Sequence, residues 1–112
     1  MAKFIVSKND GNYRFNLKAL NGETILTSES YSSEKACLGG IESVKQHSSN
    51  LANYEEKTAT NGQFYFVLKA PNHEVIGTSE TYISKESRKL GIEAVMEKAP
   101  LAVIYEAENT GE

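Results

Sequence analysis

An internal repeat constrains this chain of 112 residues more strongly than any other feature. When the sequence is shifted by 51 positions, Gly11 falls on Gly62, and the alignment continues without a gap until Val44 falls on Val95. Of these 34 aligned positions, 17 are identical. Such agreement identifies a duplicated unit, and a residue present in both copies serves something that both copies need.

The length of the chain indicates how the two copies are related. A folded domain of about 100 residues buries roughly two thirds of the surface that its unfolded chain exposes, whereas a unit of half that length is marginally stable alone. We therefore expect a single compact domain made of two internal repeats, at about 1–50 and 51–107, followed by a flexible tail at 108–112.

Each copy shows the same succession of patterns. The segments 12–19 and 63–70 alternate between apolar and polar residues, which is typical of a half-buried strand. Asn-Gly at 21–22 predicts a type I′ hairpin turn in the first copy. A short strand is expected after this turn, at about 23–28 in the first copy and 74–79 in the second.

A helix is expected next in each copy, with Ser33 and Ser84 as N-caps. Each helix repeats its core-facing residues at helical spacing: Cys37, Ile41, Val44 and Ser48 in the first copy, and Arg88, Ile92, Val95 and Ala99 in the second. Both helices contain a glycine, Gly40 or Gly91, that costs up to about 1 kcal/mol relative to alanine. We expect close approach of helix to sheet to offset this cost, because a Cβ would not fit there.

Further strands are expected at 3–8, 51–58 and 101–107, which gives the order β-β-β-α-β-β-β-α-β. Hairpins joined by short turns produce an antiparallel sheet, and a helix with one apolar stripe needs one sheet face to cover it. The residues therefore predict an α+β fold in which both copies build one mainly antiparallel sheet with both helices on one face.

The two repeated segments resemble the two repeats of the YegP-like family of small bacterial proteins of unknown function. The residues that carry the resemblance are FNLKALNGETILTSESYSSEKACLGGIESV and FVLKAPNHEVIGTSETYISKESRKLGIEAV. The resemblance implies tandem β-β-β-α-β units that share one sheet and exchange their C-terminal strands. It implies no activity, substrate or catalytic residue.

Charge and composition argue against several classes of function. A net charge of −3 gives no electrostatic reason to expect binding to nucleic acid or to an anionic membrane. A single cysteine cannot form an intramolecular disulfide, and no apolar run resembles a signal peptide or a membrane span, so we expect a cytoplasmic protein. Cys37 is interpreted as a core residue rather than a reactive thiol.

Recognisable catalytic, metal-binding and phosphate-binding motifs are absent from the sequence. The only histidines, His47 and His73, do not recur between the copies, so no metal site and no cofactor are expected. An enzyme of an unrecognised type stays open as the weakest alternative.

The residues that recur between the short strand and the helix form one candidate site. They are Thr27, Ser28, Glu29 and Tyr31 in the first copy, and Thr78, Ser79, Glu80 and Tyr82 in the second. Hydroxyls, a carboxylate and a phenol could form a polar pocket. The same residue types also cap helices and anchor their first turn, and this structural interpretation is favoured.

The sheet face away from the helices is the second candidate site. Its predicted residues differ between the copies: Arg14, Asn16 and Lys18 in the first, and Tyr65, Val67 and Lys69 in the second. The favoured function is a non-enzymatic interaction module that uses this face or the sheet edges, with a protein partner or a second copy. The alternative is a small ligand or single-stranded nucleic acid on the same face.

Overall fold

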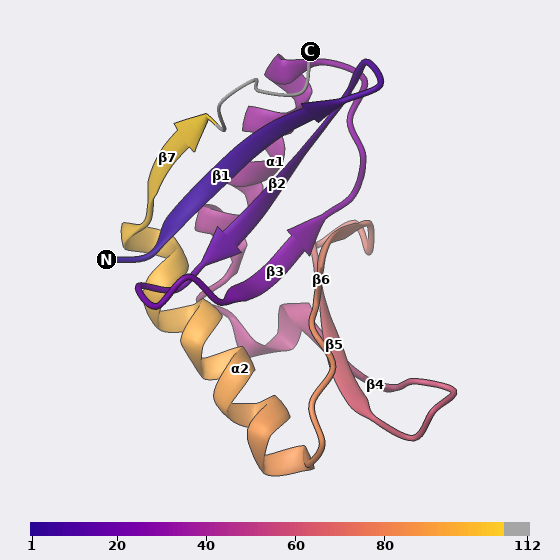
Figure 1. Cartoon of the computed structure of the whole chain (residues 1–112). Helices are drawn as coiled ribbons and strands as arrows, with labels where there is room; N and C mark the ends of the chain where they lie inside the picture. The colour runs from indigo at the N-terminus through magenta and orange to yellow at the C-terminus, as the bar shows by residue number, and fades with distance from the viewer. Residues whose placement is uncertain (107–112) are drawn as a thin grey trace.

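A computed structural model describes residues 1–106 (Figure 1), so the tail predicted at 108–112 lies outside the described residues. The order of elements agrees with the one expected from sequence. The strands are β1 (Lys3–Asn9), β2 (Asn12–Lys18), β3 (Thr24–Ser28), β4 (Tyr54–Thr58), β5 (Phe64–Lys69), β6 (Val75–Ser79) and β7 (Val103–Glu106), the helices are α1 (Glu34–His47) and α2 (Lys85–Lys98), and the short 3-10 turns are η1 (Leu51–Asn53) and η2 (Ala99–Leu101).

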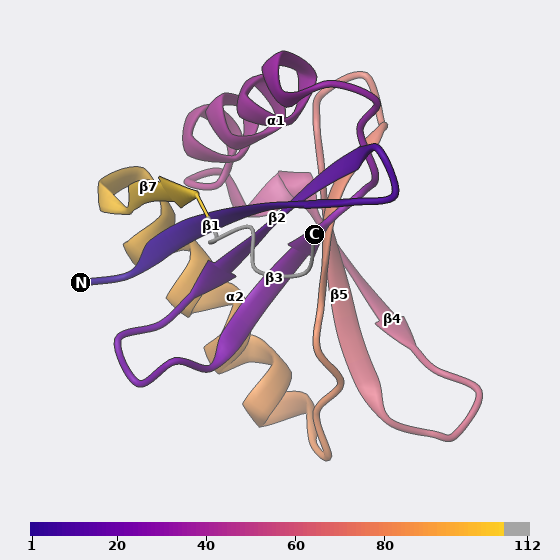
Figure 2. The same ribbon diagram turned by 45° about the horizontal axis from the view of Figure 1, so that its top comes forward.

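All seven strands of the described residues join one sheet in the order β4-β5-β6-β3-β2-β1-β7. Neighbouring strands are antiparallel, except that β1 and β7 run parallel. In units of the form β-β-β-α-β, β4 is the last strand of the first unit and pairs with β5 of the second, and β7 is the last strand of the second unit and pairs with β1 of the first (Figures 1 and 2). The predicted exchange of C-terminal strands is therefore confirmed.

The two repeats meet where β3 pairs with β6. Thr27 lies opposite Thr78 at the middle of this seam, so the seam relates the two repeats by an approximate twofold axis. On the helix side, Leu26 and the equivalent Gly77 both lie next to this axis. A Cβ added to Gly77 would lie 2.8 Å from Cγ of Leu26, so one leucine fills the space that two equivalent side chains would otherwise share.

Both helices cover one face of the sheet: in the view of Figure 1, α1 lies behind β1 and β2, and α2 runs below β3. The predicted core-facing residues of both helices are buried, including Arg88, which is 6% exposed. The predicted N-caps are also present, because the hydroxyl of Ser33 accepts a hydrogen bond from the amide of Ala36 at 3.1 Å and that of Ser84 from the amide of Ser87 at 3.0 Å. The period of apolar residues thus placed both helices correctly.

The expected type I′ turn is wrong. Such a turn needs positive φ at two successive residues, but within this turn only Gly22 (φ 88°) has it in the first copy and only His73 (φ 74°) in the second. The amide of Gly22 bonds to the carbonyl of Ala19, which closes a turn that ends in one left-handed residue. The register of the neighbouring strands shifts at this point, so the turn is of the three-residue type with a bulge.

Candidate functional site

The repeated serines of the strand-to-helix junction have a structural role. Ser28 and Ser79 are buried, and each hydroxyl accepts a hydrogen bond from a strand amide, that of Phe15 or Phe66, at 2.9 Å. Each hydroxyl also donates to the carbonyl of the next residue at 2.7 Å. These side chains therefore satisfy backbone groups where β3 and β6 leave their neighbouring strands.

The repeated tyrosines fill the gap between sheet and helix. The ring of Tyr31 stacks on Phe15 with centroids 6.3 Å apart, and the ring of Tyr82 stacks on Phe66 at 6.4 Å. A Cβ on Gly91 would lie 2.6 Å from Cζ of Tyr82 and would also clash with its hydroxyl oxygen. The expectation that a Cβ would not fit is correct, but the group that occupies the space is a tyrosine ring rather than the sheet itself.

The tyrosine hydroxyls lie among carboxylates from both repeats. Burial raises the pKa of Tyr82, and the charges of Glu80 and then Glu23 raise it further. Tyr31 is in the same situation, because burial, Cys37, Glu29 and Glu74 all raise its pKa. The pKa of each tyrosine is thus raised by one glutamate of its own repeat and by one glutamate of the other repeat. Within residues 1–106, neither hydroxyl donates a hydrogen bond to the protein.

The second candidate site is the sheet face away from the helices, which we call the open face. Its residues follow from strand alternation, since side chains that neighbour buried ones along a strand point to the opposite side. One row crosses the whole sheet by register, through Tyr105, Ile5, Asn16, Thr27, Thr78, Val67 and Glu55. The amide of Asn16 donates to the hydroxyl of Thr27 at 2.9 Å, which links β2 to β3 within this row.

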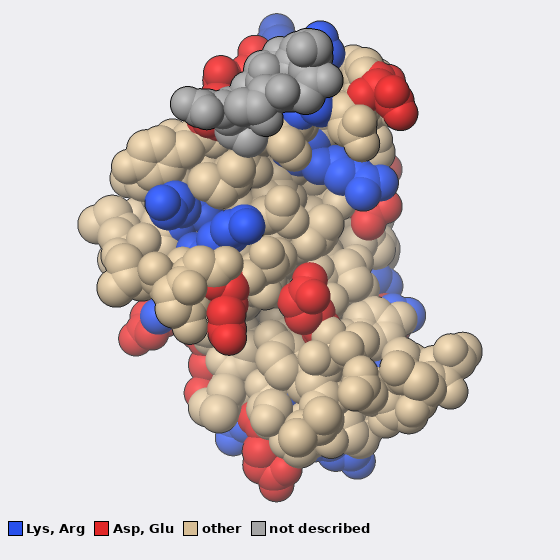
Figure 3. Space-filling view, in the orientation of Figure 1, with Lys and Arg blue, Asp and Glu red and all other residues tan. Residues whose placement is uncertain are grey.

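Charge is distributed unevenly between the open face and the rest of the molecule. The outward strand positions hold Lys3, Arg14, Lys18, Lys57 and Lys69, but only one carboxylate, that of Glu55, within residues 1–106. Figure 3 shows Lys and Arg groups over β1 and β2 on this side, with acidic groups below them. The face is therefore cationic although the chain as a whole carries a net charge of −3.

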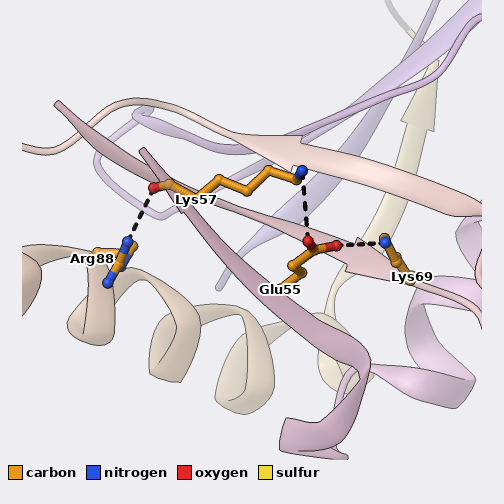
Figure 4. Close-up of polar contacts among 4 residues, drawn as sticks. All are labelled: Glu55, Lys57, Lys69 and Arg88. Carbon is orange, nitrogen blue, oxygen red and sulfur yellow. Dashed lines mark hydrogen bonds and ion pairs between the residues drawn. The ribbon is translucent and has the colours of Figure 1, made fainter. Parts of the chain in front are cut away.

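In the second half of the open face, the cations are paired. Glu55 contacts Lys57 at 3.6 Å and makes a closer ion pair with Lys69 (Figure 4). The hydrogen bond from Lys69, and then the charge of Lys57, lower the pKa of the Glu55 carboxyl. Glu55 lies directly opposite Val67, and these ion pairs draw the long side chains around it. Val67, predicted as a binding residue, is consequently only 5% exposed, so its side chain is not available on the surface.

In the first half, the cations have no acidic partner among the described residues. Lys3 and Lys18 lie directly opposite one another on β1 and β2, an arrangement that destabilises a sheet. The ammonium group of Lys3 lies 5.2 Å from the ring centroid of Tyr105, which is 53% exposed. Further along β2, Arg14 lines a polar hollow of about 420 Å³ together with Ser7, Asn9, Asn12, Ser30 and one acidic residue, Asp10, with which it makes no ion pair.

The remaining predictions for this face are placed as follows. Arg14 is exposed, whereas Asn16, Lys18, Tyr65 and Lys69 are half-buried on the open face. Sequence reasoning missed Lys3, Glu55, Lys57 and Tyr105, which complete the face. These four lie outside the repeated window, on strands whose neighbours in the sheet the periodicity did not reveal.

Other chemistry finds little support in residues 1–106. No group of three or more His, Cys, Asp or Glu side chains could hold a metal ion among them. Cys37 is fully buried, and its burial raises the pKa of the thiol, which makes it a poor nucleophile. No helix within this range is long and apolar enough to cross a membrane.

Comparison with known proteins gives consistent matches. Residues 8–55 and 59–106 each match a family described as a domain of unknown function, DUF1508. The UPF0339 protein YegP of Escherichia coli is 53% identical over 93 residues, which cover 82% of this chain and 84% of that protein.

Two solution NMR structures have a similar fold. The structure of YegP from E. coli gives a TM-score of 0.90 at 46% identity and covers 99% of this chain and 95% of that one. The structure of protein SO3888 from Shewanella oneidensis gives a TM-score of 0.88 at 42% identity, over 94% of this chain and 90% of that one.

Proposed function

This chain belongs to the DUF1508 family and is similar to the YegP protein of E. coli, and we propose that it is a non-enzymatic interaction module whose open face binds single-stranded nucleic acid. The observation that supports this proposal is the concentration of Lys3, Arg14 and Lys18 on one face without acidic partners among the described residues. A net charge of −3 argued against nucleic acid, but a ligand that touches one face responds to the charge of that face.

Several features favour a single strand over other anions. Tyr105 and Tyr65 place aromatic rings on the same face as the cations, and unstacked bases bind to such rings without sequence preference. Asn16 and the threonines of the central row offer hydrogen-bonding groups between the two aromatic positions. An acidic protein segment would pair with the cations but would gain less from stacking on the aromatic rings.

The opposed pair of Lys3 and Lys18 gives a further reason. Like charges directly opposite each other cost the folded protein stability, and a phosphate between them removes that cost. Arg14, four residues along the same strand, offers a second cation for a phosphate. A cytoplasmic location, inferred from the single cysteine, is compatible with such a ligand.

Fluorescence anisotropy with oligo-U and oligo-dT of about 12 nucleotides tests this proposal, because single-strand sites span about 4–16 nucleotides. We expect affinity to fall as salt rises from about 50 to about 200 mM, with a slope of roughly −0.7 for each phosphate neutralised. A variant with Lys3→Gln, Arg14→Gln and Lys18→Gln should bind weakly and with a shallower slope. A control with Lys35→Gln, Lys45→Gln and Lys89→Gln, which removes three cations from the helices, should bind like the wild type.

Glu55→Gln provides a test in the opposite direction. Loss of this carboxylate releases Lys57 and Lys69 from their ion pairs, so binding should become tighter and the salt slope steeper. Equal loss of binding in the helix control would contradict the proposal, as would the absence of binding at about 50 mM salt. Tighter binding of polyglutamate than of either oligonucleotide would show that the partner is an acidic protein instead.

A further inference from the structure

A cleft between the two repeats lies apart from the open face. It has a volume of about 550 Å³ and is formed by the turn between β2 and β3 with the start of β3 on one side, and by the segment 80–82 and the second half of α2 on the other. This volume is within the range of small-molecule sites, about 300–1,000 Å³. Its walls come from both repeats, so it exists only because the two units are assembled around one sheet.

The cleft combines opposite charges with an apolar surface. Its charged residues are Glu23, Glu80 and Lys98, and Tyr82 and two threonines add hydroxyl groups. Ile25 and Ala94 contribute apolar surface beside them, along with smaller residues. A pocket of mixed charge with an apolar wall matches a ligand that carries an ammonium group, a carboxylate and an apolar group on one small framework.

Packing accounts for the ring of Tyr82 but not for its hydroxyl. The ring stacks on Phe66 and occupies the space over Gly91, and phenylalanine would do the same. The hydroxyl faces the cleft and makes no hydrogen bond to residues 1–106. Because burial and the two glutamates raise its pKa, it remains protonated and able to donate to a ligand. Within residues 1–106, the ion pair of Lys98 is an exposed contact of 3.6 Å with Glu97, which holds it weakly.

We propose that this cleft binds a zwitterionic small molecule of the α-amino acid class. The ammonium group of the ligand lies between Glu23 and Glu80, its carboxylate faces Lys98 and the Tyr82 hydroxyl, and its side chain lies against Ile25 and Ala94. This proposal does not depend on nucleic-acid binding, since no cleft residue belongs to the open face cations.

The first repeat supplies an internal control. Tyr31, Glu29 and Glu74 reproduce the tyrosine and its two glutamates, and Gly40 lies under the ring as Gly91 does. The position equivalent to Lys98, 51 residues earlier, is His47. Without a permanent cation at that position, the first repeat lacks the group that would pair with the carboxylate of the ligand.

The test is an NMR titration of the full chain with L-leucine, with 3-methylbutylamine, which lacks its carboxylate, and with 4-methylpentanoate, which lacks its amine. We expect L-leucine to bind tightest and to shift amide signals at 19–25, 80–82 and 91–98. Glu80→Gln should weaken L-leucine binding by roughly tenfold, the effect of one charge-assisted hydrogen bond. Lys98→Ala should make L-leucine bind no better than 3-methylbutylamine. The matched variant Glu74→Gln should leave its affinity unchanged.

Tyr82→Phe separates ligand binding from packing. It should weaken L-leucine binding while leaving the melting temperature close to that of the wild type, because the ring contacts remain. The proposal is overturned if none of the three compounds shifts the cleft signals, or if Glu80→Gln and Glu74→Gln weaken binding equally. Shifts confined to the equivalent region around Tyr31, Glu29 and Glu74 would overturn it as well.

Discussion

The two halves of the sheet have the same backbone plan and different surfaces. In the second half, Glu55 neutralises Lys57 and Lys69, whereas in the first half Lys3 faces Lys18 and neither makes an ion pair within residues 1–106. The features common to both halves, namely the capping serines, the tyrosine over a glycine and the buried hydroxyl at each junction, serve assembly. Duplication preserved what the fold requires, and the differences mark where the halves can act differently.

The largest expected effect comes from the seam, where the repeats cannot be equivalent. Leu26→Ala should cost about 2–5 kcal/mol of unfolding free energy, since it empties the space beside Gly77. Gly77→Leu alone should also destabilise, because two leucines would then compete for that space. The double variant Leu26→Gly with Gly77→Leu moves the leucine to the other repeat and should recover much of the loss. Urea denaturation measures all three, and wild-type stability of Gly77→Leu alone would contradict this account.

The next effect concerns a feature that the two repeats share. Gly91→Ala should destabilise by about 1–3 kcal/mol despite the better helix propensity of alanine, because the new Cβ overlaps the ring of Tyr82. Gly40→Ala should behave alike, since its Cβ would lie 2.7 Å from Cζ of Tyr31 and 3.0 Å from Phe15. Gly39→Ala, one residue away with nothing within 4 Å, is the control and should be neutral or stabilising. A rise in melting temperature in Gly91→Ala would refute the contact.

A smaller effect comes from Tyr54, which faces Leu68 as Phe4 faces Leu17 in the other half. Its hydroxyl donates to the carbonyl of Ser48 at 2.7 Å, and burial raises its pKa. Tyr54→Phe places a phenylalanine at this position in both halves. It should lower the free energy of unfolding by about 1 kcal/mol near neutral pH, because the hydrogen bond is lost.

The same residue predicts a pH dependence. A raised pKa means that the folded state holds the phenol proton above about pH 10, where the unfolded chain loses it. The stability contribution is therefore complete below about pH 10 and falls as pH rises beyond it. Tyr54→Phe should flatten this alkaline decline in urea denaturation series, although Tyr31 and Tyr82, whose pKa values are also raised, keep part of it. An unchanged slope would contradict the role of Tyr54.

The smallest effect concerns the hairpin turns. Gly22 and His73 occupy equivalent left-handed positions, with φ of 88° and 74°. Histidine is strained there and glycine is not, so His73→Gly should stabilise by roughly 0.5–1 kcal/mol. The reciprocal change, Gly22→His, should destabilise by a similar amount. Thermal denaturation compares the two, and a loss of stability in His73→Gly would show that the histidine makes a compensating contact.

Most of the fold could be predicted from the sequence because the same periodicity of apolar residues occurs in both copies. Alternation in 12–19 and 63–70 and the spacing from Cys37 to Ser48 identified strands and helices that the structure contains. The placement of the outer strands could not be predicted by periodicity. Although 51–58 and 101–107 correspond in sequence, the spatial counterpart of β4 is β1, which pairs with β2 as β4 pairs with β5. β7 is thereby displaced to the sheet edge.

The candidate site was harder to predict for the same reason. Arg14, Asn16 and Lys18 lie within one strand, so their alternation placed them on one face. The opposed lysine and the exposed Tyr105 come from strands separated by most of the chain, and only the sheet order brings them together. Burial of Val67 depends on ion pairs with β4, which a strand pattern does not contain.

The parallel pairing of β1 with β7 also has a mechanical consequence. The pairing runs from Lys3 opposite Val103 to Val6 opposite Glu106, so the first strand of the chain and its last described strand lie side by side and point the same way. A stretching force applied at residues 1 and 106 pulls these strands lengthwise in opposite directions. The evenly spaced bonds of a parallel pair then carry the load together, in shear, instead of opening one after another. The pairing of β1 with β7 thus links the two repeats and resists a force that pulls on the two ends of the chain.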